Sequence, residues 1–62
     1  MRITIMKNNG LKNVYSIDED NFVEVKYERK NKVSYTESKI WTERTLDKFL
    51  TKTKNLNRTI EV

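Results

Sequence analysis

The chain has 62 residues, of which 35% are hydrophobic and 35% are charged, and its formal net charge is +4. It contains no cysteine and no histidine, which excludes disulfide bonds and metal sites built from these residues. A chain of this length forms a single small domain, residues 1–62, whose core leaves it marginally stable. Its stability must come from one tight core or from a partner, so we expect it to self-associate.

The composition also favours a cytoplasmic protein. No apolar run approaches the roughly 20 residues of a membrane span, and residues 1–6 include Arg2 and are too short for a signal peptide. The lack of cysteine is typical of a reducing compartment. Lysine, asparagine and isoleucine are abundant and proline is absent, a usage typical of AT-rich genomes such as those of low-GC bacteria and their phages or plasmids.

Positive charge is concentrated in the second half of the chain. Residues 1–28 contain four basic and five acidic residues, a net charge of −1, whereas residues 29–62 contain nine basic and four acidic residues, a net charge of +5. Such an asymmetry indicates either an anionic partner for the second half or a charged surface that keeps the domain soluble.

The first two predicted strands flank a turn at residues 8–10. Apolar and polar residues alternate on both sides of it, which is typical of a half-buried hairpin. A three-residue loop pairs Ile3 with Tyr15 and keeps the apolar side chains on one face, whereas a two-residue loop would divide them between the faces. The longer loop also uses Gly10 as the left-handed residue that this loop type requires.

Two further loops of the same length are predicted, at residues 19–21 and 29–31. They end in Asn21 and Asn31, and asparagine is the residue type that most readily replaces glycine in the left-handed conformation. Three loops that keep the same face apolar predict a four-stranded antiparallel meander. Its strands are expected at about residues 1–7, 11–18, 22–28 and 32–37. Its inner face is expected to consist of Ile3, Ile5, Tyr15, Ile17, Val23, Val25, Tyr27, Val33 and Tyr35.

A helix is predicted at about residues 43–53. Thr42 is a suitable N-cap, and Trp41 and Leu46 have the spacing of a hydrophobic staple around a helix start. Asn55 breaks the helical pattern and is the expected residue just beyond the helix end. The apolar stripe that would pack across the sheet consists of Leu46, Phe49, Leu50 and Thr53.

Residues 57–62 alternate again and predict a short C-terminal strand, with a frayed tail as the alternative. A helix that runs back over the sheet would place this strand antiparallel to the first, in the order 5-1-2-3-4. The predicted fold class is therefore α+β: a four-stranded antiparallel meander, one helix packed across it and a short C-terminal strand.

The sequence indicates a protein that is not an enzyme. General acid–base catalysis most often uses histidine, which is absent, and the serines have no neighbouring base. Asp18, Glu19 and Asp20 offer oxygen ligands but lack the spacing of a calcium-binding loop, so we expect an acidic turn without metal. No glycine-rich phosphate loop is present, and we expect neither a cofactor nor a small-molecule substrate.

Two basic clusters are candidate contact sites for a partner or a nucleic acid. On the predicted helix, Arg44, Lys48 and Lys52 recur every four residues and form a row on the face away from the apolar stripe. The alternative interpretation of this row, and of the second cluster, is a solvated surface. The second cluster lies at a predicted turn and consists of Arg29, Lys30 and Lys32.

We therefore expect a small accessory protein that acts by binding another protein. The partner is a second copy, a host protein that it modulates or inhibits, or both, and no membrane is involved. The alternative is a nucleic-acid-binding protein that uses the basic second half, whose binding would weaken steeply with salt. In topology alone, four strands followed by a helix resemble the dimeric single-strand-binding fold of some transcriptional coactivators. The predicted core position of the tyrosines argues against base stacking and favours a protein partner.

Overall fold

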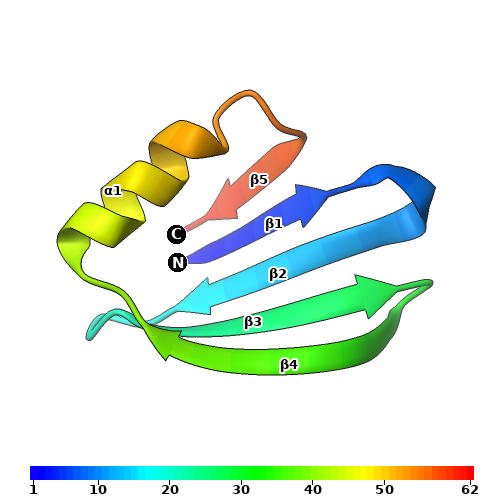
Figure 1. Ribbon diagram of the computed structural model, residues 1–62, viewed down its shortest axis with the longest axis horizontal. Coiled ribbons are helices and arrows are strands. Elements are labelled where there is room, and N and C mark those ends of the chain that lie inside the picture. Colours follow the sequence, from blue (N-terminus) through cyan, green and yellow to red (C-terminus); the bar gives the residue numbers. More distant parts are fainter.

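The computed structural model describes all residues, 1–62, and shows an α+β fold with one antiparallel five-stranded sheet and one helix (Figure 1). Its elements are β1 (Arg2–Met6), a 3-10 turn (Asn8–Gly10), β2 (Leu11–Ile17), β3 (Phe22–Arg29), β4 (Lys32–Ile40), α1 (Glu43–Lys52) and β5 (Arg58–Glu61). The strands lie in the order β4-β3-β2-β1-β5, so β4 and β5 form the two edges of the sheet. The single helix is neither long enough nor apolar enough to cross a membrane.

The C-terminal strand β5 is a full member of the sheet. It pairs antiparallel with β1, where Ile60 lies opposite Ile3, and so covers one edge of the N-terminal strand. The sheet is therefore one sheet of five strands, rather than the four-stranded meander plus a short C-terminal strand of the predicted fold class, and the alternative of a frayed tail is wrong. The order of the strands agrees with the prediction.

The first two hairpins have the predicted registers. Ile3 lies opposite Tyr15, and β2 pairs with β3 in the register of a three-residue loop. The residues that end these loops have left-handed backbones, with φ angles of 73° at Gly10 and 63° at Asn21. Asn9 is also left-handed, with a φ of 65°, which the sequence analysis did not predict.

Asp18 explains why the acidic loop is a tight turn. Its carboxylate Oδ1 accepts hydrogen bonds from the backbone N–H groups of Asp20, at 2.9 Å, and Phe22, at 3.0 Å. A side chain that binds the backbone two residues farther on stabilises a turn in this way. The Asn21 side chain in turn donates to Glu43 Oε1 at 3.0 Å, which ties the turn to the first residue of α1.

The third hairpin differs from the prediction. Its turn consists of two residues, Lys30 and Asn31, with φ angles of 52° and 65°, instead of a three-residue loop at residues 29–31. A two-residue turn with two positive φ angles matches the twist of a hairpin. The register then shifts by one residue at a bulge that leaves Ser34 without a partner. The Ser34 hydroxyl donates to the carbonyl oxygen of Tyr27 at 2.9 Å and holds the bulge against β3.

The bulge changes which side chains of β4 are enclosed. Tyr27 lies opposite Tyr35 rather than opposite Val33. Val33 and Tyr35 are 52% and 58% exposed, so their prediction as core residues is wrong. Beyond the bulge, β4 continues to Ile40 instead of ending near residue 37 as predicted.

The core lies between the sheet and α1, at the end of the sheet where both chain termini are found (Figure 1). The rings of Tyr15, Trp41 and Phe49 pack against it, with centroid distances of 4.6 Å from Tyr15 to Phe49 and 4.8 Å from Trp41 to Phe49. Tilted ring pairs at such distances stabilise a fold beyond the area that they bury. The enclosed apolar side chains are Ile3, Ile5, Ile17, Val23 and Val25.

Helix α1 begins at the predicted residue. The Thr42 hydroxyl oxygen accepts a hydrogen bond from the backbone N–H of Thr45 at 3.1 Å, which is the expected N-cap contact. The helix ends with Thr53 as its C-cap, one residue earlier than predicted. Because Thr53 is the C-cap, the residue just beyond the helix end is Lys54, so the prediction of Asn55 at that position is wrong.

Arg58 holds the C-terminal end of α1 against the sheet. Its Nη1 donates to the carbonyl oxygen of Leu50 at 2.6 Å and to the hydroxyl of buried Thr53 at 3.1 Å. A cation at this position satisfies carbonyl groups that have no partner within the helix and complements the helix dipole. Arg58 therefore serves the fold by joining β5 to α1.

The β3–β4 turn provides a test of the backbone geometry. Replacement of Asn31 by glycine should change the free energy of unfolding little, because glycine adopts positive φ at no steric cost. Replacement by valine should lower it by about 1–3 kcal/mol, because a β-branched residue is strained in that conformation. Urea denaturation of both variants measures the difference. Equal stability of the two would contradict the observed turn.

Candidate functional site

The outer edge of β4 is the longer of the two free edges of the sheet. β4 borders the sheet over nine residues and no other element lies beyond it (Figure 1). The backbone N–H of Trp41 donates to the carbonyl oxygen of Asn21 at 3.0 Å, so position 41 faces β3. Because hydrogen-bonding direction alternates along an antiparallel strand, the N–H and C=O groups of Thr36, Ser38 and Ile40 face outward from the sheet. Such a row is a template for another strand.

Two large apolar side chains lie beside this edge. Ile40 is 69% exposed and lies directly opposite Phe22, which is 54% exposed. Both project from the sheet face that α1 does not cover, because the residues that alternate with them, Val23 and Lys39, face the helix side with the core. The pair forms an apolar surface that adjoins the unpaired backbone groups of β4.

The helix side of the same edge is polar. Glu37 and Lys39 lie on the inner face of β4, opposite Val25 and Val23. Glu37 Oε2 accepts a hydrogen bond from the Tyr27 hydroxyl at 3.0 Å and lies 3.4 Å from Lys39 Nζ. Both side chains of the ion pair are more than one third exposed, at 36% and 38%, so they remain accessible to a partner.

Burial raises the pKa of the Tyr27 phenol above its ordinary value of 10.0, and the hydrogen bond that it donates to the Glu37 carboxylate adds to the shift. The folded protein therefore holds this proton more tightly than the unfolded chain does. Because proton binding and folding are linked, the stability that the Tyr27 phenol contributes is fully present below pH 10. It is lost as the pH rises through the raised pKa of the folded protein.

Tyr27→Phe tests this coupling. The variant lacks the ionisable phenol, so its stability should fall less steeply above pH 10 than that of the wild-type protein. Urea denaturation across this pH range measures the effect. A wild-type protein whose alkaline stability follows that of the variant would contradict the predicted shift.

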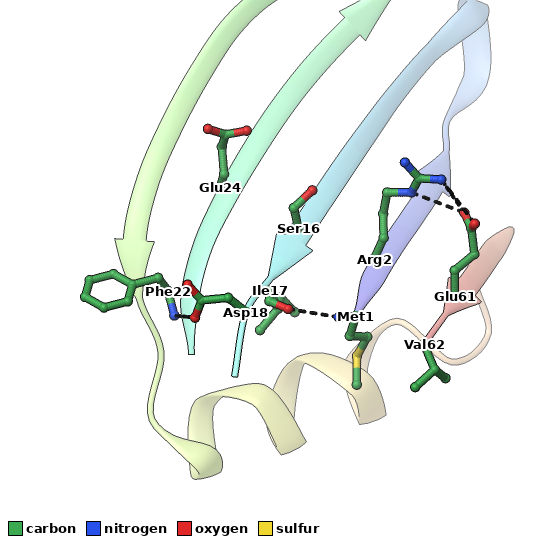
Figure 2. Close-up of a pocket in the computed structure, with 9 residues that line it drawn as sticks. All are labelled: Met1, Arg2, Ser16, Ile17, Asp18, Phe22, Glu24, Glu61 and Val62. Carbon is green, nitrogen blue, oxygen red and sulfur yellow. Dashed lines mark hydrogen bonds and ion pairs between the residues drawn. The ribbon is translucent and has the colours of Figure 1, made fainter. Parts of the chain in front are cut away.

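A shallow hollow of about 570 Å³ lies on the open sheet face at the end where the termini are found. Figure 2 shows Glu24, Ser16, Arg2 and Glu61 in a row that crosses β3, β2, β1 and β5. Arg2 donates to Glu61 through both Nε and Nη2, at 3.0–3.2 Å. Phe22 also lines the hollow, and its ring is directed toward the β4 edge (Figure 2).

The charges on this open face are largely compensated. Three of the four ion pairs lie on it: Arg2 with Glu61 at 3.0 Å, Lys12 with Glu28 at 3.8 Å and Lys26 with Glu24 at 3.7 Å. A face on which each cation has a nearby anion does not present the continuous positive potential that attracts a phosphate backbone.

The structure does not bring the two predicted basic clusters together. Helix α1 and the β3–β4 turn lie at opposite ends of the sheet (Figure 1). All six side chains are exposed, and none takes part in an ion pair. The helix row contains Arg44, Lys48 and Lys52, and the turn cluster contains Arg29, Lys30 and Lys32.

The turn cluster has an aromatic neighbour that the sequence analysis missed. Tyr35, which was expected in the core, is exposed and stacks on Tyr27 with 5.5 Å between the ring centroids. Arg29 lies two residues along β3 from Tyr27 and therefore on the same face as Tyr35.

The sequence analysis also missed Glu37, Lys39 and Ile40 as surface residues of an edge strand. The sequence did contain a signal for a longer edge strand, because the alternation of side chains continues after Tyr35 through the charged residues Glu37 and Lys39. Inward-facing charges are typical of edge strands. No group of three or more acidic side chains lies close enough to hold a metal ion.

Comparison of the chain with protein families, curated proteins and solved structures finds no match.

Proposed function

We propose that this protein is a small non-enzymatic accessory module that acts by binding another protein, either a second copy of itself or a host protein that it modulates or inhibits. The binding surface is the β4 edge with the adjoining apolar pair Phe22 and Ile40. This proposal keeps the interaction that the sequence analysis expected but moves it from the basic residues to the free edge of the sheet.

The observation that carries the proposal is the combination of outward-facing backbone groups with exposed apolar area. Thr36, Ser38 and Ile40 offer three N–H and three C=O groups without strand partners. An added strand gains affinity from such groups, and pockets or apolar side chains beside it give specificity. Ile40 and Phe22 supply that apolar area.

Ser38→Pro tests the proposal. Proline removes only the outward-facing N–H at this position, so the ladder between β3 and β4 keeps its hydrogen bonds. The variant should fold, as circular dichroism and thermal unfolding can verify, but should lose strand pairing at the edge. In capture experiments from lysate of the source cells, a genuine partner should bind the wild-type protein and not Ser38→Pro.

The matched control is Arg44→Glu with Lys48→Glu, which changes the helix face and leaves the edge intact. A partner of the edge should still bind this variant, with at most a slower association rate. Capture that depends on the helix row and not on Ser38 would contradict the proposal.

A second candidate function is binding of single-stranded nucleic acid at the β3–β4 turn. The observation that favours it is the exposed ring of Tyr35 beside the cationic residues Arg29, Lys30 and Lys32. Bases stack on exposed aromatic rings within positively charged surfaces. The helix row lies at the other end of the sheet and would not contact the same short strand.

Fluorescence anisotropy with labelled oligonucleotides tests this second function. Tyr35→Ala should weaken binding, and Arg29→Glu with Lys32→Glu should reduce the salt slope by about one per lost phosphate contact. Arg44→Glu with Lys48→Glu should leave the affinity unchanged. Absence of binding at low salt would exclude this function and leave the protein partner.

A further inference from the structure

We propose that the partner of the β4 edge is a second copy of this chain, paired antiparallel about a two-fold axis at Ser38, so that two sheets join into one of ten strands. This inference rests on the proposed function and names its partner and register. Of the two sheet edges, β4 has nine residues and β5 has four, so β4 offers the longer template.

The charges of β4 select the register. A two-fold axis at Glu37 would place the two copies of that carboxylate opposite each other, and an axis at Lys39 would do the same with two ammonium groups. Like charges directly opposite are destabilising in a sheet. An axis at Thr36 would extend the pairing into the bulge at Ser34, where the strand departs from regular geometry. Among the axes at positions 36 to 39, only the one at Ser38 avoids both problems, and an axis at Ile40 would extend the pairing past the end of β4.

That register pairs opposite charges twice. Glu37 of each copy lies opposite Lys39 of the other, on the helix side of the sheet. Within one chain, both contacts of the Glu37 carboxylate are made by Oε2, with the Tyr27 hydroxyl at 3.0 Å and Lys39 Nζ at 3.4 Å. Oε1 makes no hydrogen bond or ion pair within the chain and can accept from the Lys39 ammonium of the second copy. Four charges of alternating sign would then line the interface.

The open face gains apolar contact in the same register. Ile40 lies opposite Thr36 of the second copy, so the most exposed large apolar side chain of β4 packs against a β-branched neighbour. The outward N–H and C=O groups of positions 36, 38 and 40 all find partners in the second copy. An interface of one short strand pair is small, so we expect a weak dimer that exchanges rapidly with the monomer.

Single cysteine substitutions test the register, since the natural chain has no cysteine. In the proposed dimer, the two Ser38 Cα atoms lie about 5.5 Å apart, within the range that a disulfide spans. The two Thr36 Cα atoms lie about 14 Å apart, because they are four residues out of register on neighbouring strands. Under mild oxidation, Ser38→Cys should form a disulfide-linked dimer, and Thr36→Cys should remain monomeric.

Both positions are exposed, so neither substitution should disturb the fold. Crosslinking of Thr36→Cys in preference to Ser38→Cys would overturn the proposed register. Ser16→Cys, on the same open face but on β2, is the control for random collision. Crosslinking at that position as fast as at position 38 would also overturn the proposal.

A mixing experiment tests the charge pairs. Glu37→Lys alone would place four cations at the interface, and Lys39→Glu alone would place four anions there, so each variant should be monomeric. In an equal mixture, every cation of one variant lies opposite an anion of the other. The mixture should dimerise at a concentration at least about tenfold lower than either variant alone, as sedimentation equilibrium can show.

The matched control mixes Arg2→Glu with Glu61→Lys, which reverses an exposed ion pair at the other edge of the sheet. This mixture should dimerise no better than its components. Failure of the Glu37 and Lys39 variants to complement each other would overturn the proposal.

The experiments distinguish an error in the proposed partner from an error in the proposed protein-binding function. If the wild-type protein is monomeric at all accessible concentrations but captures a host protein in a manner that Ser38→Pro abolishes, the second copy is wrong and the protein-binding function stands. If Ser38→Pro changes neither self-association nor capture, both are wrong.

Discussion

Replacement of Ile3 by alanine is expected to lower the free energy of unfolding by about 2–5 kcal/mol. Ile3 lies on β1, between β2 and β5, and its side chain has an exposed fraction of 0%. The substitution removes three carbon atoms and leaves a cavity that neighbouring strands cannot close without moving the sheet. A domain of this size has a total stability of only about 3–9 kcal/mol, so a substantial unfolded population at room temperature is the expected result.

Urea denaturation followed by circular dichroism measures this effect, and Ile60→Ala is its matched control. Ile60 lies opposite Ile3 on the edge strand β5 and is 39% exposed. The same change in chemistry should cost less there, because less apolar area is enclosed. Equal losses at the two positions would show that the core does not centre on β1.

The first two hairpins and the helix start could be predicted because several local signals agree at each of them. At the first hairpin, Gly10 and the alternation of apolar residues favour the same register. At the helix start, the capping residue Thr42 and the apolar stripe define the same boundary. A register that is one residue off would have moved every apolar side chain of these strands to the wrong face.

The third hairpin could not be predicted in the same way, because its register depends on a single unpaired residue. The two-residue turn with a bulge at Ser34 pairs Tyr27 with Tyr35, whereas a three-residue loop at residues 29–31 without a bulge would pair Tyr27 with Val33. The flanking residues are charged and carry no preference for either face. The bulge is stabilised by the contact of Ser34 with the Tyr27 carbonyl, which exists only once the strands are paired.

The candidate contact residues could likewise be predicted only in part from the sequence. The charge pattern alone identified the six basic residues as exposed, but whether they act together depends on where the chain places them. The structure separates the helix row from the turn cluster by the length of the sheet (Figure 1). The contacts of Arg58 with the end of the helix could not be predicted from the sequence either, because Leu50 and Thr53 meet Arg58 only through the packing of α1 on β5.

Replacement of Trp41 by alanine is expected to lower the free energy of unfolding by about 3 kcal/mol, the lower end of the range for large aromatic residues, because the ring is half-buried rather than enclosed. Trp41 connects the edge strand to the helix. The centroid of its ring lies 4.8 Å from that of Phe49 and 6.0 Å from that of Tyr15. Its backbone N–H donates to the carbonyl oxygen of Asn21 and so adds the last hydrogen bond between the chain segments of β3 and β4.

Trp41→Phe is the control, because it keeps an aromatic ring in the stack and should cost about half as much or less. Thermal unfolding compares the two variants, and the fluorescence of Trp41, the only tryptophan, reports its environment in the wild-type protein. An emission maximum equal to that of free indole in water would contradict the packing. Since β4 ends one residue before Trp41, the alanine variant should also fray the edge at Ile40. Self-association should then weaken at temperatures where the rest of the domain is still folded, which links the aromatic stack to the proposed interface.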